Sequence, residues 1–188
     1  MKLGPVGLAI VMILGCSRGP VGSSPVPPPG PVAGPPSIIA MQATASIIDL
    51  AGNPIGTAGF ADTRDGLLIR GAVSGLGKGT HGVHLHAVGS CAPPFSSAGP
   101  HFNPTGAQHG YKNPSGHHAG DLPNIVTPPA GTYPFQFVVD GVKLTGKGGL
   151  LDADGASIVF HSSADDFLTD PSGNSGARLA CGVITLSK

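Results

Sequence analysis

Short β-rich runs separated by glycine-bearing turns fill the chain from residue 38 onward. Turn signals such as Asp65-Gly66 and Asp140-Gly141 lie between these runs. No stretch has a convincing helical periodicity, and the 31 glycines, 20 prolines and absence of tryptophan are typical of a loop-rich chain. We therefore expect an all-β sandwich or barrel of about eight antiparallel strands. The expected strands are residues 39–50, 54–62, 66–73, 82–88, 133–140, 142–145, 157–161 and 179–186.

Two connections between these strands are too long for ordinary hairpins. They are residues 90–129 and 162–177. Connections of that size without regular structure are uncommon in compact domains and are usually functional. The first contains four histidines, Asp121 and Cys91, and the second lies between His161 and Cys181. We expect the functional groups to be concentrated there.

All eight histidines lie between His81 and His161. Neutral imidazole is a common ligand of transition metals, so this concentration in a chain with only 11% charged residues predicts a metal site. Side chains alternate along a strand, so His84 and His86 point the same way and could bind one ion. His81 lies on the opposite face and is interpreted as structural.

The first 15 residues have the pattern of a secretory signal peptide. Lys2 precedes an apolar stretch, residues 3–14, that is too short to span a bilayer. The stretch ends in Ile13-Leu14-Gly15-Cys16, which resembles the lipobox of bacterial lipoproteins, where the cysteine is lipidated after cleavage. We expect residues 1–15 to be removed and Cys16 to be lipidated, in the bacterial cell envelope or periplasm. The alternative is an ordinary signal peptide with an incidental cysteine.

Residues 16–37 are rich in proline, glycine and serine and cannot bury a core. We expect a semi-rigid tether of up to roughly 60 Å, at about 3.1 Å per residue, ahead of one domain at residues 38–188. The formal net charge of zero gives no electrostatic footprint for nucleic acid or an anionic membrane surface. Any membrane contact is therefore expected only through the lipid.

Several motifs occur together in a recognisable order. They are Gly82-Val83-His84-Leu85-His86, Ser97-Ala98-Gly99-Pro100-His101-Phe102-Asn103-Pro104, His109-Gly110, His118-Ala119-Gly120-Asp121-Leu122, Val159-Phe160-His161, Ala164-Asp165-Asp166 and Gly176-Ala177-Arg178-Leu179-Ala180-Cys181-Gly182-Val183-Ile184. In this order they resemble the copper/zinc superoxide dismutases over residues 40–186. The resemblance implies an eight-stranded antiparallel Greek-key β-barrel, an immunoglobulin-like sandwich with two long functional loops. It also implies dismutation of superoxide to dioxygen and hydrogen peroxide.

The resemblance also implies a role for each residue at a matching position. One copper ion per subunit would be bound by His84, His86, His101 and His161, and one zinc ion by His101, His109, His118 and Asp121. His101 would bridge the metals and take part in catalysis, Arg178 would attract the anionic substrate, Asp165 would hold His84 and His109, and Cys91 and Cys181 would form a disulfide. His117 is a rival zinc ligand, but the family's spacing to the aspartate, matched here by His118-Ala119-Gly120-Asp121, favours His118.

The second long connection departs from the animal members of this family. Residues 162–177 form a comparatively short segment without lysine. We hypothesise that electrostatic steering of superoxide is weak and depends mainly on Arg178. Two alternatives are a non-catalytic metal-binding or copper-transfer domain of the same fold, and a copper enzyme without zinc. Superoxide is the only expected small-molecule partner, and the chain is expected to be a monomer or a homodimer.

Overall fold

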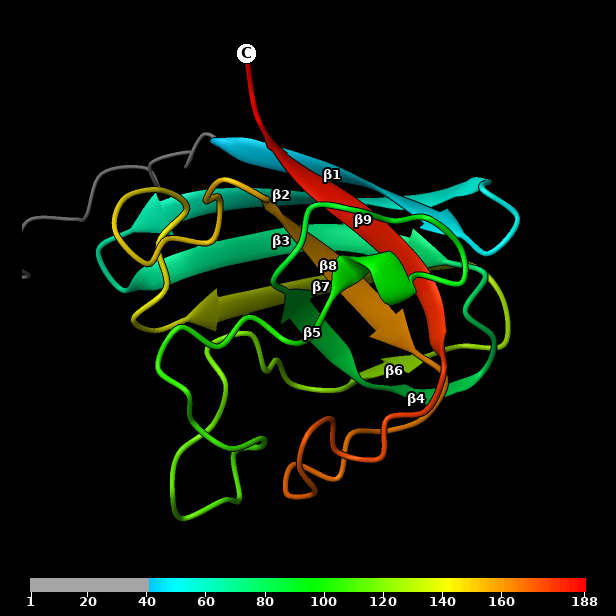
Figure 1. The fold of residues 1–188 in the computed structure, drawn as a ribbon. Helices are drawn as coiled ribbons and strands as arrows, with labels where there is room; N and C mark the ends of the chain where they lie inside the picture. Colours follow the sequence, from blue (N-terminus) through cyan, green and yellow to red (C-terminus); the bar gives the residue numbers. More distant parts are fainter. Residues whose placement is uncertain (1–40) are drawn as a thin grey trace, which may run out of the picture. The chain divides into compact units, whose positions relative to one another are not determined.

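The computed structural model describes residues 41–188. The predicted signal peptide, Cys16 and tether lie outside the described residues. Within residues 41–188 the chain is all-β, apart from one turn of 3-10 helix, η1 (Ser96–Ala98) (Figure 1). No helix in this part of the chain is long and apolar enough to cross a membrane. The strands are β1 (Ala43–Asp49), β2 (Pro54–Thr63), β3 (Gly66–Ser74), β4 (Gly79–His81), β5 (Val83–His86), β6 (Ile125–Thr127), β7 (Thr132–Val139), β8 (Ala156–His161) and β9 (Arg178–Leu186).

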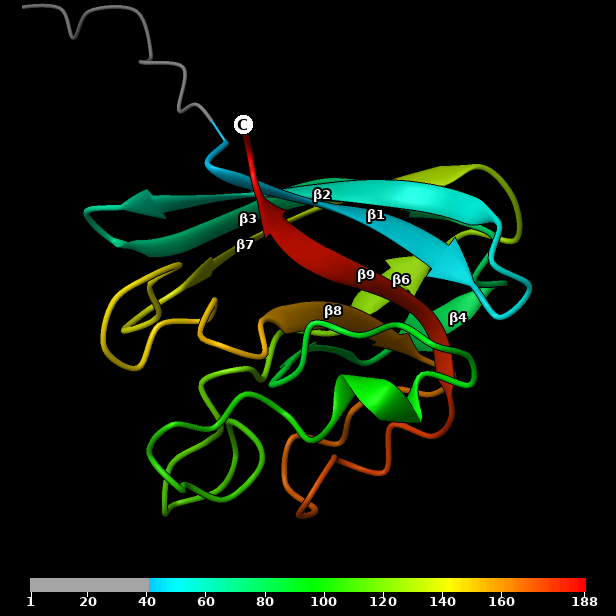
Figure 2. The same ribbon diagram turned by 45° about the horizontal axis from the view of Figure 1, so that its top comes forward.

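Seven of these strands form one antiparallel sheet in the order β5-β8-β9-β1-β2-β3-β7. The sheet curls so that its two halves face each other across the core (Figure 1, Figure 2). The neighbours β5 and β8, and β9 and β1, are far apart in the sequence, so the connections cross over the ends of the sheet. Strands β4 and β6 pair separately. The expected all-β antiparallel fold is therefore confirmed.

The strand boundaries differ from the sequence-based expectation in three places. The expected strand 82–88 is shorter, and Gly82 separates β4 from β5. Strand β6 lies inside the connection expected to have no strand, where it pairs with β4. The strand expected at residues 142–145 is wrong. That segment folds against its own loop, with hydrogen bonds from the Leu150 amide to Lys143 O and from the Leu151 amide to Leu144 O, both 2.8 Å long.

The core lies between the two halves of the sheet. Ala43, Ala45 and Ile47 alternate with more exposed residues along β1, as expected for a strand with one buried face. Strand β8 is different because all six of its residues are buried. Phe160 faces the main core, whereas Val159 packs with a second cluster under η1. The first long connection therefore covers the outer face of β8, and this cover buries the strand that ends at His161.

A disulfide links the first long connection to β9, the last strand. Cys91 and Cys181 are bonded with a Cα–Cα distance of 5.6 Å, and they are 90 residues apart in the sequence. In the chain-entropy model a loop of this size stabilises the fold by roughly 4–5 kcal/mol. The first long connection is thus covalently attached at its beginning, close to the residues that carry the site.

Candidate metal centre

Four histidines from three parts of the chain meet at the outer face of β5 and β8. His84 and His86 lie on β5, His161 is the last residue of β8, and His101 comes from the first long connection. An isolated β-bridge pairs His101 with His86. All four are buried, and one ligand atom from each lies within 4.8 Å of the others.

A second group shares His101 and adds three residues of the same connection. They are His109, His118 and Asp121, and all are buried. The Nδ1 atoms of His101, His109 and His118 lie 2.9, 3.0 and 3.3 Å from Asp121 Oδ1. The other carboxylate oxygen, Oδ2, accepts hydrogen bonds from the amides of Gly110 and His118. The backbone therefore fixes the carboxylate so that Oδ1 faces the three rings.

The first long connection is held in place by backbone pairing along β5. Leu85 N donates to Gly120 O, Phe102 N donates to Leu85 O, and Gly120 N donates to Phe102 O, each over 2.8 Å. A Cβ at Gly120 would collide with the Leu85 carbonyl, so only glycine allows this close approach. These contacts bring His101 and Asp121 beside the histidines of β5.

Asp165, from the second long connection, links the two groups. Its Oδ2 accepts a hydrogen bond from His84 Nε2 over 2.8 Å, and its Oδ1 accepts one from His109 Nε2 over 3.0 Å. With its proton on Nε2, the neutral ring of His84 has a free Nδ1 lone pair that can face a cation, and the ring of His109 turns its Nδ1 toward Asp121 Oδ1. The side chain of Asn124 pairs with the backbone N and O of Asp165, both at 2.9 Å.

Buried histidine nitrogens without a hydrogen-bond partner indicate what kind of ligand the two groups bind. Among the described residues, the buried side-chain nitrogens without a hydrogen-bond partner are His81 Nε2, His84 Nδ1, His86 Nε2, His101 Nε2, His109 Nδ1 and His161 Nε2. All except that of His81 belong to the two groups. His109 Nδ1 lies near Asp121 Oδ1 but is not aligned for a hydrogen bond.

A buried polar atom without a partner costs about 1–3 kcal/mol, so five around one site indicate that cations satisfy them. Four imidazole nitrogens suit copper, and three imidazoles with one carboxylate suit tetrahedral zinc. The residues of both groups therefore fit the metals expected for them.

Burial sets the protonation states that metal binding requires. It lowers the pKa of His84 to about 4 and that of His161 to about 3, so both rings are neutral near pH 7. Burial also lowers the pKa of His86 well below its ordinary value. For Asp121 and Asp165, burial opposes ionisation, but hydrogen bonds from the histidines outweigh it and hold both pKa values below the usual range. The four-histidine group thus offers neutral imidazoles at His84, His86 and His161, next to the ionised carboxylates of Asp121 and Asp165.

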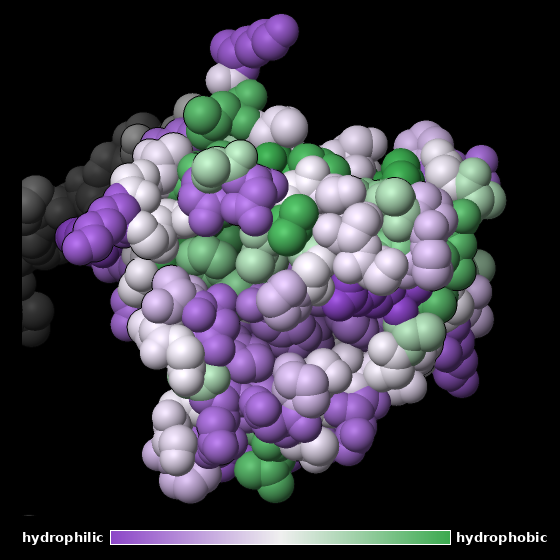
Figure 3. Space-filling view, viewed as in Figure 1, coloured by the Kyte–Doolittle hydropathy of each residue, from purple (hydrophilic) through white to green (hydrophobic). Residues whose placement is uncertain are grey.

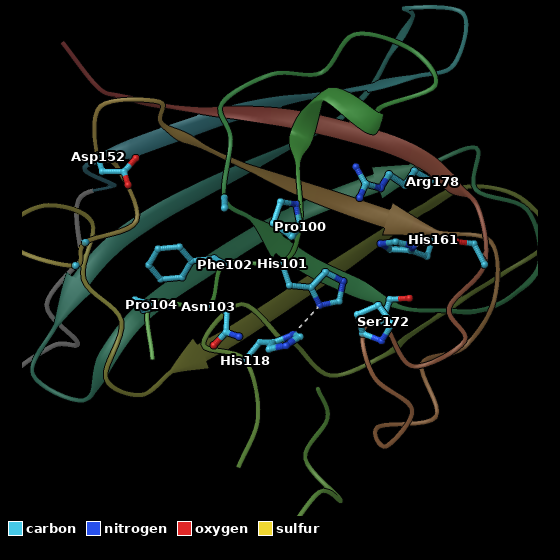
Figure 4. Close-up of a pocket in the computed structure, with 15 residues that line it drawn as sticks. Pro100, His101, Phe102, Asn103, Pro104, His118, Asp152, His161, Ser172 and Arg178 are labelled. Carbon is cyan, nitrogen blue, oxygen red and sulfur yellow. Dashed lines mark hydrogen bonds between the residues drawn. The ribbon is translucent and has the colours of Figure 1, made fainter. Parts of the chain in front are cut away.

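Arg178 lies beside the four-histidine group at the start of β9 (Figure 4). Its guanidinium donates to Phe95 O over 2.6 Å and to Gly99 O over 2.7 Å. Gly99 O also accepts a hydrogen bond from His86 Nδ1 over 2.9 Å. The arginine and one histidine of the group are therefore oriented by the same carbonyl.

A cavity of about 770 Å³ opens above these residues. His101, His161 and Arg178 lie at one end of its lining, and Asp152 lies at the other end, beyond Phe102 (Figure 4). Figure 3 shows hydrophilic residues gathered over the part of this face where the two long connections lie. The arrangement offers an anion a route to the histidines and a fixed positive charge beside them.

Two histidines lie outside both groups. His81 is buried, and its Nδ1 donates to His161 O over 2.7 Å, in keeping with the structural interpretation. His117 Nδ1 donates to His118 O over 2.8 Å, and its ring packs against Tyr111 with centroids 4.4 Å apart. The structure therefore places His118 rather than His117 in the second group.

Sequence reasoning missed the residues that support the site from outside. Asn124 holds the backbone of Asp165, and Asp170 Oδ1 accepts a hydrogen bond from the His109 amide over 2.7 Å. These contacts join positions 41 and 61 residues apart. No spacing in the sequence signals them, because the partners are backbone groups.

Comparisons with known proteins agree with this geometry. The family model described as Copper/zinc superoxide dismutase (SODC) matches residues 55–184. Cu-Zn superoxide dismutase 2 of Aquifex aeolicus is 43% identical over 148 residues, covering 77% of this chain and 86% of the relative. The Cu-Zn superoxide dismutase of Deinococcus radiodurans is 40% identical over 152 residues, covering 74% and 81%.

Among solved structures, a SOD-like protein from Bacillus subtilis superimposes with a TM-score of 0.72 at 38% identity. The match covers 76% of this chain and 98% of that one. The family model alone spans more than half of the chain, and the curated relatives are matched over most of their own length. The chain therefore belongs to the copper/zinc superoxide dismutase family.

Proposed function

We propose that this protein converts two superoxide ions and two protons into dioxygen and hydrogen peroxide. We assign copper to His84, His86, His101 and His161, and zinc to His101, His109, His118 and Asp121. The observation that carries the proposal is the convergence of unpartnered imidazole nitrogens beside Arg178 and below an open cavity. A bound copper ion supplies the one-electron changes that oxidise one superoxide and reduce another.

Each protein group has a task that follows from its position. Arg178 binds the anion next to the histidines, with its guanidinium held by two carbonyls. His101 turns Nδ1 toward Asp121 and leaves Nε2 without a protein partner. Nε2 is therefore the His101 atom available to copper, and when it is not bound to the metal it can carry a proton to the peroxide product. Asp165 keeps the rings of His84 and His109 in the required tautomer.

Superoxide dismutation by the metal-loaded protein tests this assignment. We expect His84→Ala to lower the activity by at least about 100-fold, because a copper ligand and the link through Asp165 are lost together. His117→Ala is the matched control, since it removes a neighbouring histidine that lies outside both groups. Full activity of His84→Ala would refute the copper assignment.

A non-catalytic role is the second candidate, because the Bacillus subtilis relative is described only as SOD-like. The complete four-histidine group and the adjacent Arg178 favour catalysis. The dismutation assay decides between these two candidates, and metal analysis tests the further alternative of a copper enzyme without zinc. Fewer than about one zinc ion per subunit after zinc supplementation would contradict the bimetallic site.

We also propose export and lipid attachment through Cys16, based on the first 16 residues. An extracellular Cu-Zn superoxide dismutase of Haemonchus contortus is 41% identical over 142 residues, which supports export. Intact mass of the mature protein tests the anchor. Cleavage elsewhere, or an unmodified Cys16, would exclude it.

A further inference from the structure

Three residues of the second long connection contact His109, which belongs to the group assigned to zinc. Asp165 Oδ1 accepts the ring Nε2 proton, and Asp170 Oδ1 accepts the backbone amide proton over 2.7 Å. Gly173 presses its backbone against the ring, and a Cβ there would collide with both Asp165 Oδ1 and His109 Nε2. The segment is therefore built against His109 in particular.

The same oxygen of Asp170 also faces a second residue of the zinc group. Asp170 Oδ1 lies 3.9 Å from His118 Nε2, while His118 Nδ1 faces Asp121 Oδ1 at 3.3 Å. The His118 ring thus points one nitrogen into the group and the other toward an outer carboxylate. At 3.9 Å the contact is too long for a direct hydrogen bond, but one bridging water or a small rotation of the half-exposed Asp170 side chain would close it.

A compact polar turn presents Asp170 at this position. Asp166 Oδ1 accepts the amides of Leu168 and Thr169 over 2.9 and 2.8 Å. Asp166 Oδ2 accepts Thr169 Oγ1 over 2.7 Å and Asn174 Nδ2 over 3.0 Å. The residues on both sides of Asp170 are therefore fixed by one carboxylate, so its place beside His109 and His118 is set by the folded turn.

We propose that Asp170 is a positioning residue of the zinc site, which anchors the backbone of His109 and orients the ring of His118 through Nε2–H. The inference rests on the zinc assignment made under Proposed function. Carboxylates that accept the outer N–H of a metal-bound histidine fix the ring and raise its basicity, and their loss typically costs about 10–100-fold in metal affinity. Asp170 supports the ring of His118 in this way and also the backbone of His109.

Zinc release into excess chromogenic chelator, measured apart from activity, tests the proposal on the full metal-loaded protein. We expect Asp170→Ala to release zinc roughly 10–100-fold faster while copper retention is unchanged. Asp170→Asn keeps an oxygen for the His109 amide but loses the charge that faces His118, so its rate should lie between. Asp154→Ala is the matched control, because it removes an exposed carboxylate with no side-chain hydrogen bond in the described residues.

Each outcome separates the inference from the function beneath it. A wild-type rate for Asp170→Ala would overturn the inference and leave the zinc assignment standing. Equal acceleration of copper and zinc loss, with a lower melting temperature of the metal-free protein, would overturn it by indicating a merely structural role. A wild-type rate for Asp170→Asn would overturn the part that involves His118. Wild-type protein that takes up no zinc would overturn the zinc assignment and this inference together.

Discussion

At the scale of single residues, His109 has the most unusual surroundings in the site. Its Nδ1 and Nε2 each lie 3.0 Å from a carboxylate oxygen, of Asp121 and Asp165 respectively. Burial lowers the pKa of His109, but the contacts with both carboxylates outweigh burial and raise it to about 9 in the metal-free protein. This raised pKa stabilises the metal-free fold below pH 6.5, and the contribution is lost as the pH rises through about 9.

Zinc binding should therefore displace a proton from His109. At pH 7 we expect release of about one proton per zinc ion, because the ring must lose its Nδ1 proton to bind a metal. Near pH 10 the release should approach zero, since the ring is then already neutral. Titration calorimetry in two buffers of different ionisation enthalpy measures the difference. Equal proton release at pH 7 and pH 10 would contradict the proposed state of His109.

At the scale of elements, the strands with clear alternation and glycine turns were predictable, and two short segments were not. Residues 142–145 alternate apolar and polar side chains like a strand, and Val142 and Leu144 are buried. The alternation arises because every second side chain is buried. The backbone forms its hydrogen bonds within its own loop and not with a neighbouring strand. Strand β6 has only three residues, too few to show a periodicity.

The site divides in the same way. The histidine cluster is visible in the sequence, and the motifs shared with the family pointed to Asp121 and to the two groups that the structure brings together. Asn124 and Asp170 act through backbone groups that only the folded connections bring close. A contact of that kind leaves no residue pattern, so sequence reasoning could not identify either one.

Gly173 tests how closely the second connection must pack against His109. Gly173→Ala places a methyl group against the Asp165–His109 pair, so we expect loss of zinc affinity as well as strain at φ +63°. Gly141→Ala is the control, because Gly141 has φ +69° and open space around its Cβ position. Both variants should lose about 1 kcal/mol of unfolding free energy to backbone strain. Zinc affinity equal in the two variants would argue against close packing at Gly173.

At the scale of the whole molecule, β5 and β8 carry three of the proposed metal ligands, and the first long connection carries the others. The disulfide joins the start of the first connection to β9, three residues after Arg178. The carbonyls of Phe95 and Gly99 in that connection then hold the guanidinium. Covalent and polar contacts thus position the one cationic side chain that lines the cavity within residues 41–188.

Steering of superoxide should consequently depend on Arg178. The chain has zero formal net charge, and the cavity lining also contains Asp152. We expect Arg178→Ala to lower kcat/KM by roughly tenfold or more with copper content unchanged, and to abolish most of a shallow salt dependence. Pulse radiolysis at several ionic strengths measures both. A steep salt dependence that persists in Arg178→Ala would show that other charges guide the anion.

The breadth of the cavity has a consequence for selectivity among anions. Its volume of about 770 Å³ lies in the range of sites that enclose drug-sized molecules, whereas superoxide has only two atoms. Such an opening cannot exclude competitors by size. The protein must instead discriminate between anions where the guanidinium and the imidazoles converge. Larger anions can therefore enter the cavity, and they compete with superoxide only beside Arg178 and the four-histidine group.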